Sequence, residues 1–248
     1  MNENDITDKR GIKEFKGITF SKYKKSDAKK ELLNNLSTGK IEPACYWTAE
    51  YVCAGHYADI WEIILLFCSK HIHLGNPKLP IYLDLRLTHF KQILNGGYQD
   101  NILKMRNSEK IRKLFGEIIS VLCLSKKKHS FDNIKISKDD FNITKITYKL
   151  KADTTQYGST IFKKEDPTEL FVGINEFCWN ILKPQKNGAL ACYWLEWILG
   201  FEDICKKEIK KYTGARRSNM PIEGIYQKDI IWMIWECLLL EANNRSKG

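Results

Sequence analysis

The sequence lacks the long apolar runs that membrane-spanning helices need. Its uninterrupted apolar stretches, such as residues 63–68 and 237–240, are far shorter than the roughly 20 residues that cross a bilayer. Residues 1–25 are polar and charged, without the apolar stretch that is typical of a secretory signal. We therefore expect no membrane partner and a location inside the cell, in the cytoplasm or the nucleus.

Sequence motifs for nucleotide or metal chemistry are also missing. The chain has no G-x-x-x-x-G-K-[ST] phosphate-binding loop. His71 and His73 lie near His56 and Cys68, but no C-x-x-C or H-x₃₋₅-H pair, the usual spacing of zinc ligands, is present. The sequence therefore predicts neither a metal nor a cofactor.

The cysteines and the glutamates are better explained by packing than by catalysis. Cys45 and Cys192 stand in two copies of one short segment, which favours a packing role over that of a catalytic nucleophile. Glu62 and Glu236 each follow a tryptophan, and neither begins the Glu-x-x-His spacing of a two-metal helical bundle. We expect the eight cysteines to be reduced and mostly buried. A non-enzymatic protein is predicted, and an enzyme with an unrecognised site is a third hypothesis.

Arginine is scarce, and lysine carries most of a formal net charge of +10. Such a charge favours polyanionic partners such as a DNA or RNA backbone, and lysine suits diffuse phosphate attraction better than bidentate base recognition. The codon bias of an AT-rich genome explains the lysine content equally well, and a basic segment can be merely a solvated surface. The candidate nucleic-acid-binding residues are Lys126, Lys127, Lys128, Lys206, Lys207, Lys210, Lys211, Arg216 and Arg217.

What the sequence does have is a helical pattern of apolar residues. Leu83, Leu87, Phe90 and Leu94, for example, recur at the spacing of one helix face. We predict an all-α fold, a helical bundle of two quasi-repeated halves. The expected helices cover residues 27–36, 43–54, 58–71, 83–94, 111–124, 168–182, 189–199, 202–212 and 226–242. Residues 81–87 also alternate like a strand, which is the alternative there.

The predicted domain organisation is a basic flexible tail, residues 1–25, followed by a single helical domain, residues 26–248. The two halves of that domain cover residues 26–128 and 166–248. Residues 129–165 form an insertion in which apolar residues nearly alternate with Thr and Lys. This pattern fits either a short β-hairpin or an irregular segment.

A short internal repeat supports the division into halves. Residues 44–47 and 191–194 both read Ala-Cys-Tyr-Trp, and a Trp-Glu pair followed by an apolar run comes after each copy. An old duplication of a helix pair explains the repeat, and convergent core composition is the alternative. Duplication predicts that Trp47 and Trp194 are both mostly buried and occupy equivalent places.

Residues 27–77 resemble the helical collar of clamp-loader-type proteins, above all the tetramer-forming C-terminal half of the MgsA/WRNIP family. The shared residues are Ala44, Tyr46, Trp47, Ala49, Ala54, Gly55, Phe67, Ser69, Ile72, Leu74 and Pro77. The family's paired arginines in its third helix are replaced around Glu62, and the ATPase module is absent. The resemblance implies a fold and an oligomerising role. The whole chain is also similar to helical proteins of large DNA viruses, which adds a viral factory or a virion as a location.

The first half is rich in large apolar side chains. Tyr51, Tyr57 and Trp61 supply more apolar surface than a helix pair covers, so we expect a protein partner or a homo-oligomer contact there, unless the second half covers it. These features favour a non-enzymatic adaptor or oligomerising module of a DNA replication, repair or packaging assembly, with weak attraction to a phosphate backbone. The alternative is a structural or assembly component of a large DNA virus particle.

Overall fold

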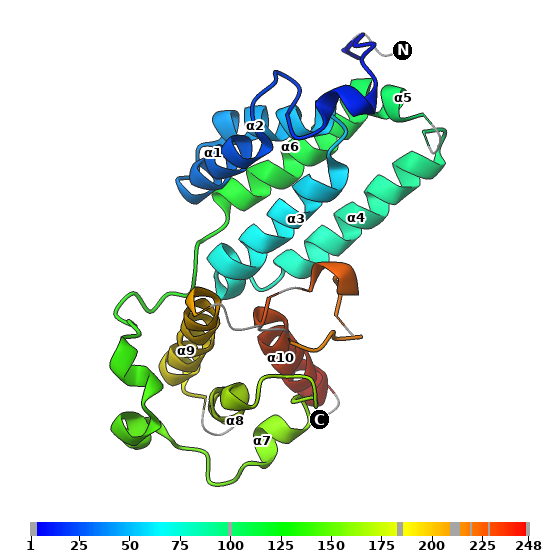
Figure 1. Ribbon diagram of the computed structural model, residues 1–248. Coiled ribbons are helices and arrows are strands. Elements are labelled where there is room, and N and C mark those ends of the chain that lie inside the picture. The colour runs from blue at the N-terminus through cyan, green and yellow to red at the C-terminus, as the bar shows by residue number, and fades with distance from the viewer. Residues whose placement is uncertain are drawn as a thin grey trace. The chain divides into compact units, whose positions relative to one another are not determined.

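The computed structural model describes residues 4–98, 101–182, 186–208, 214–218, 220–227 and 229–246, apart from the side chain of Lys206. In this part of the chain the protein is all-α, as predicted, and its one β-type contact is an isolated bridge between Ile18 and Lys24 (Figure 1). The chain divides into two compact units, Met1–Lys128 and His129–Gly248. No helix of the described residues is both long and apolar enough to cross a membrane.

Unit 1 is a bundle in which one central helix packs on several others. Its long helices are α1 (Lys25–Ser37), α2 (Ile41–Cys53), α3 (Tyr57–Phe67), α4 (Leu79–Asn95) and α6 (Glu109–Leu124), with shorter turns η1 (Ile12–Phe15), η2 (Cys68–Ile72), η3 (His73–Gly75) and α5 (Ile102–Asn107). Helix α2 packs against both α1 and α6. Helix α6 buries one apolar stripe, in which Ile111, Phe115, Ile118 and Leu122 recur every three or four residues.

The large apolar side chains of the first half lie in the core of unit 1. Trp61 packs against Phe90 and Phe115, with ring centroids 6.1 Å and 5.3 Å away, and Tyr57 packs on the same two rings. Tyr51 and Trp61 are only 1% and 2% exposed. The prediction of an interface is therefore wrong for Tyr51 and Trp61, which helices of the same unit already cover. The Tyr51 hydroxyl donates to the Lys25 carbonyl of α1, and Trp61 packs against α4 and α6.

The N-terminal segment is folded onto unit 1, so the prediction of a flexible tail over residues 1–25 is wrong for the described residues from 4 onwards. The backbone N–H of Ile6 donates to the Asn107 carbonyl, and the Asn107 side chain donates to the Asp8 carbonyl. Phe15 is buried in the apolar core. The sequence of the segment does not predict this contact, because the residue that holds the segment is an arginine far away in the sequence.

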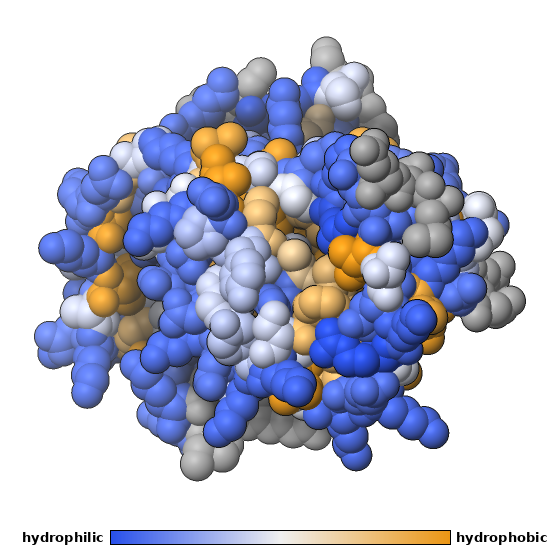
Figure 2. All heavy atoms as spheres, turned by 90° about the horizontal axis from the view of Figure 1, so that it is seen from above, coloured by the Kyte–Doolittle hydropathy of each residue, from blue (hydrophilic) through white to orange (hydrophobic). Residues whose placement is uncertain are grey.

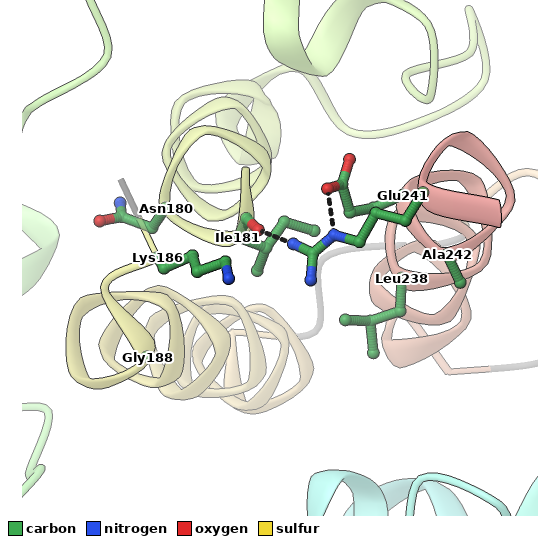
Figure 3. A pocket seen from close by; sticks show the side chains of 8 residues that line it. Asn180, Ile181, Lys186, Gly188, Leu238, Glu241 and Ala242 are labelled. Atoms are coloured by element: carbon green, nitrogen blue, oxygen red, sulfur yellow. Dashed lines mark hydrogen bonds and ion pairs between the residues drawn. The ribbon is translucent and has the colours of Figure 1, made fainter. Parts of the chain in front are cut away.

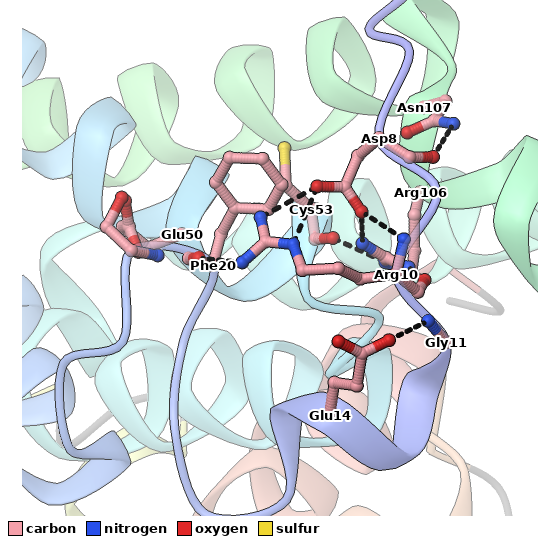
Figure 4. A network of polar contacts seen from close by, with 10 residues as sticks. Asp8, Arg10, Gly11, Glu14, Phe20, Glu50, Cys53, Arg106 and Asn107 are labelled. Atoms are coloured by element: carbon pink, nitrogen blue, oxygen red, sulfur yellow. Dashed lines mark hydrogen bonds and ion pairs between the residues drawn. The ribbon is translucent and has the colours of Figure 1, made fainter.

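The arginine that holds the N-terminal segment is Arg106, a buried residue of α5 (Figure 4). Its guanidinium donates to the Cys53 carbonyl at 2.6 Å and to Asp8 Oδ1 at 2.8 Å, and it lies 4.2 Å from the centre of the Phe15 ring. Burial raises the pKa of Asp8, but hydrogen bonds from Arg10 and Arg106 outweigh it and hold the pKa below its usual value. The ion pair thus fixes the N-terminal segment across α5 and α2.

Unit 2 is built on three long helices, α8 (Phe171–Ile181), α9 (Gly188–Lys207) and α10 (Ile231–Ser246), with α8 packed against both others. Its shorter elements are η4 (Lys138–Phe141), η5 (Ile143–Lys149), α7 (Gln156–Ser159), η6 (Thr168–Leu170) and η7 (Gly224–Tyr226). Helix α9 continues through Gly200, where two separate helices were predicted. A Cβ at Gly200 would lie 3.1 Å from the Phe141 ring, so this glycine makes room for packing and does not end the helix.

The segment over residues 129–165 takes the irregular form, with short 3₁₀ turns, the single-turn helix α7 and no strand. Asp140 attaches it to α9. The Tyr193 hydroxyl donates to Asp140 Oδ1 at 2.7 Å, and the Trp197 indole donates to the Asp140 carbonyl at 2.7 Å. Burial raises the pKa of Asp140, but hydrogen bonds from Tyr193, Ser137 and Lys149 together hold it well below its usual range.

We expect Tyr193→Phe to lower the free energy of unfolding by about 1.5–3 kcal/mol at pH 7, because it removes a hydrogen bond to a carboxylate. The pKa of Asp140 is lower in the folded protein than in the unfolded chain. The stabilisation by the Tyr193 hydrogen bond is therefore fully present above about pH 4, and it is lost as the pH falls through the pKa of Asp140 in the folded protein. Urea unfolding of both proteins at pH 7 and at the lowest pH where they stay folded measures the difference. A difference in unfolding free energy between the two proteins that becomes larger in acid would contradict the role of Tyr193 as a donor to ionised Asp140.

The two Ala-Cys-Tyr-Trp segments lie in different environments. Tyr46 of α2 is 47% exposed, whereas Tyr193 of α9 is 6% exposed. Trp194 is completely buried, and Trp47 is partly exposed. Both tryptophans are thus mostly buried, as predicted. The prediction of equivalent places is wrong, because Asp140 bonds Tyr193 and Trp197 of α9, whereas the Tyr46 side chain of α2 reaches the surface.

Candidate nucleic-acid interface

The basic residues near the end of α9 that were predicted to bind phosphate lie in different environments. Lys210, Lys211 and the side chain of Lys206 lie outside the described residues. Lys207 and Arg216 are exposed. The Arg216 guanidinium donates a hydrogen bond to the Gln227 carbonyl, so one of its donors stabilises the loop.

Arg217 is a buried structural residue, and its prediction as a nucleic-acid contact is wrong. It is 3% exposed, and its guanidinium donates to both carboxylate oxygens of Asp166, at 3.1 Å and 2.8 Å. Its Nε lies 2.9 Å from Glu236 Oε2. The side chain of Gln227 also bonds both the N–H and the carbonyl of Arg217. These partners offset the cost of burying the guanidinium, and its burial keeps it away from a phosphate at the surface.

The predicted cluster over residues 126–128 lies in unit 1, at the end of α6. Lys126 and Lys128 are exposed. The Lys127 amine donates to the carbonyls of Leu122, Cys123 and Ser125 at 2.7–2.9 Å, and burial lowers its pKa. Lys127 therefore caps the carbonyl end of α6, a position that favours positive charge, and serves the fold.

The positive charge of the chain is concentrated in unit 1. Unit 1 has 22 lysines and arginines against 14 acidic residues, or +8, whereas unit 2 has 18 against 16, or +2. Hydrophilic side chains cover most of the face in Figure 2, with hydrophobic ones in separate patches. Among the described residues before α2, the exposed lysines without an ion-pair partner are Lys9, Lys13, Lys16, Lys22, Lys24, Lys30 and Lys40.

Glu50 holds a turn of this basic segment, residues 18–24, against α2. The Thr19 hydroxyl donates to Glu50 Oε2 at 2.7 Å, and the N–H and hydroxyl of Ser21 donate to the same carboxylate at 2.8 Å and 2.6 Å. The N–H of Phe20 donates to the Glu50 carbonyl. The isolated bridge between residues 18 and 24 closes the turn. A buried glutamate therefore fixes the position of a surface turn.

The turn presents an aromatic ring and two lysines beside two aromatic residues of α2. Tyr23 lies edge-on to Trp47 at 5.0 Å, and Tyr46 lies edge-on to Trp47 at 5.2 Å. Tyr23 and Tyr46 are 44% and 47% exposed, and Lys22 and Lys24 flank Tyr23. A hydrogen bond with Tyr23 and partial burial raise the pKa of Tyr46 to about 12, so the Tyr46 hydroxyl is neutral at pH 7. We call Lys22, Tyr23, Lys24, Tyr46 and Trp47 the aromatic–basic patch.

Sequence reasoning missed this patch. The Ala-Cys-Tyr-Trp pattern predicts that Trp47 lies in the core. The polarity of residues 1–25 predicts a flexible tail, which includes the Lys-Tyr-Lys run of residues 22–24. An aromatic residue between two lysines in a polar segment is the signal that was present. Its partners on α2 were not visible, because they meet it only in the fold.

A second candidate is a cavity of about 380 Å³ in unit 2, between the end of α8, the start of α9 and α10 (Figure 3). Arg245 crosses it, donating to Glu241 Oε1 and to the Ile181 carbonyl, both at 2.6 Å. Lys186 is the other charged residue that lines it. The lining residues provide no nucleophile beside a base, so the cavity suggests no reaction.

Within the described residues, no group of three or more His, Cys, Asp or Glu side chains is placed to hold a metal ion. His71 of η2 is exposed and His73 of η3 is buried. No protein-family model, curated protein or solved structure matches the chain.

Anchoring by Glu50 gives a test of the patch geometry. We expect Glu50→Ala to cost about 1–3 kcal/mol of unfolding free energy, since it leaves the buried Thr19 hydroxyl without its acceptor. It should also release Tyr23 from Trp47 and increase quenching of Trp47 by iodide. Urea unfolding and iodide titration measure the two effects. Glu42→Ala, an exposed glutamate in the first turn of the same helix, is the control and should change neither.

Proposed function

We propose that this protein is a non-enzymatic adaptor that binds single-stranded nucleic acid through the aromatic–basic patch. The observation that carries the proposal is the cluster of Tyr23, Tyr46 and Trp47 at the surface of the more basic unit, between lysines that have no acidic partner in the described structure. Exposed aromatic rings in a positively charged region are the usual elements of sequence-tolerant single-strand binding.

The chemistry of the patch favours weak binding without sequence preference. An aromatic ring that stacks on a base contributes about 1–3 kcal/mol, and every base has a face to stack on. Lysine attracts phosphate as a point charge and does not read base edges as the arginine fork does. Arg106 and Arg217 are both buried in ion pairs with aspartates. The proposed ligand is therefore the backbone and bases of a single strand, with affinity that decreases as salt is added.

The adaptor role draws on the sequence. The likeness of residues 27–77 to clamp-loader collars favours an assembly role in DNA replication, repair or packaging, because the collar is an oligomerising element in those proteins. In this chain that stretch spans α1, α2 and α3. We propose that the protein contacts another protein or a second copy of itself while the patch holds the strand.

Fluorescence anisotropy of a labelled oligothymidylate, titrated with the full-length protein across a salt series, tests the proposal. For about three phosphate contacts, log K is expected to fall linearly with log salt, with a slope of about −2. Tighter binding to the single strand than to a duplex of equal length is expected, because only unstacked bases can lie on the rings. Equal affinity for both, or no binding at low salt, would overturn the proposal.

A further inference from the structure

Two cysteines of unit 2 are in contact in the core. Cys178 of α8 donates a hydrogen bond to Cys237 of α10, with the two Sγ atoms 3.2 Å apart. Both thiols are free, and both residues are buried. A disulfide needs an S–S distance of about 2.05 Å, so the sulfurs have to approach by only about 1 Å.

The pair is buried but has access to a cavity. A cavity of about 220 Å³ lies between α7, α8 and α10, and both cysteines line it together with Tyr157, Ile161 and Leu240. A water molecule takes up about 30 Å³ of liquid volume, so the cavity has room for a small oxidant.

We propose that Cys178 and Cys237 form a reversible disulfide that links α8 to α10. Two observations support the site: the sulfurs are already in contact, and a cavity leads a small molecule to them. The oxidant is a peroxide, with hydrogen peroxide as the simplest member of the class. This inference is independent of the nucleic-acid patch, which lies in unit 1.

The reaction balances with one peroxide per pair. Cys178 is the more exposed of the two, so its sulfur, after losing a proton, attacks one peroxide oxygen. The O–O bond breaks, a sulfenic acid forms and the first water leaves. The Cys237 sulfur then attacks the Cys178 sulfur, the S–O bond breaks, and the second water leaves with the remaining thiol proton. The two thiols lose two electrons in total, and a dithiol reductant reverses the step.

Burial and the hydrogen bond from Cys178 raise the pKa of Cys237 far above that of a free thiol. The second step is therefore slow at neutral pH, since the thiolate is the attacking species. The link closes a long loop between the two helices and restrains the unfolded chain. We expect it to raise the melting temperature of unit 2 by roughly 10 °C.

The test is peroxide treatment of the full-length protein, followed by alkylation in denaturant and non-reducing peptide mapping. The expected product is a peptide pair joined through Cys178 and Cys237, lighter than the two thiol peptides by two hydrogen atoms. Dithiothreitol should restore both thiols and return the melting temperature to its initial value. The mapping uses the wild-type chain, so it does not depend on whether a variant folds.

Variants separate this pair from the other cysteines. Cys178→Ser should abolish the linked peptide and the rise in melting temperature, whereas Cys45→Ser, on α2 in the other unit, should leave both unchanged. Recovery of alkylated Cys178 and Cys237 after other cysteines have been oxidised would overturn the proposal. Oxidation of Cys178 to a sulfinic acid, without a link to Cys237, would overturn it as well.

Discussion

Reversing two lysines of the aromatic–basic patch, Lys22→Glu with Lys24→Glu, should weaken single-strand binding by at least tenfold at low salt and make the salt slope shallower by about 1.4. The reason is that each lysine lost removes one phosphate contact and its counterion release. Removing a ring, in Tyr46→Ala, should also weaken binding by about tenfold but leave the salt slope unchanged, because stacking releases no counterions. Anisotropy titrations across a salt series distinguish the two classes.

The matched control is Lys78→Glu with Lys110→Glu, which makes the same charge change at two exposed positions of the same unit, one directly before α4 and one on α6. It lowers the net charge equally, so its effect measures non-specific attraction. An equal loss of affinity in the control and the patch variant would mean that net charge alone drives binding. An unchanged affinity in Tyr46→Ala would remove the stacking part of the proposal.

Arg217→Ala should be among the most destabilising single changes in unit 2, costing about 3–5 kcal/mol of unfolding free energy. The change leaves the Asp166 carboxylate, which is completely buried, without its bidentate partner, and removes the guanidinium charge beside Glu236. Asp166 also accepts the N–H groups of Lys163 and Ala215, so the loss disturbs two chain segments. Urea unfolding followed by tryptophan fluorescence gives the value.

Arg216→Ala is the natural comparison, because Arg216 is adjacent and exposed and donates only to a loop carbonyl. We expect a cost below about 1 kcal/mol there. A similar cost for the two variants would mean that the Arg217 ion pairs contribute little. Arg217→Lys should lie between them, since lysine keeps the charge but loses the bidentate geometry.

The helices of this chain could be predicted largely from local patterns. In α6 the apolar residues repeat at helical spacing over the whole element, and the predicted helix over residues 111–124 lies inside the observed one. At α9 local patterns failed, because they divide one helix into two, over residues 189–199 and 202–212. The ring of Phe141, nearly 60 positions away in the chain, occupies the space that Gly200 leaves.

The candidate sites were harder to predict because they depend on long-range contacts. Arg217 and Arg216 are neighbours of the same type, and only the position of Asp166 makes one a core residue and the other a surface residue. Likewise Tyr46 and Tyr193 share a four-residue context but differ in burial, and only Tyr193 donates a hydrogen bond to Asp140. A single sequence does not reveal which partner a charge or ring meets across the fold.

Hydrogen–deuterium exchange of the full-length protein, with and without an oligothymidylate, tests the central claim most directly. The patch model predicts slower exchange in the turn over residues 18–24 and around Tyr46 and Trp47 of α2 when the strand binds, with little change in unit 2. Slower exchange confined to residues 206–217 would contradict the patch model. Binding of the strand without slower exchange around the aromatic–basic patch would contradict it as well.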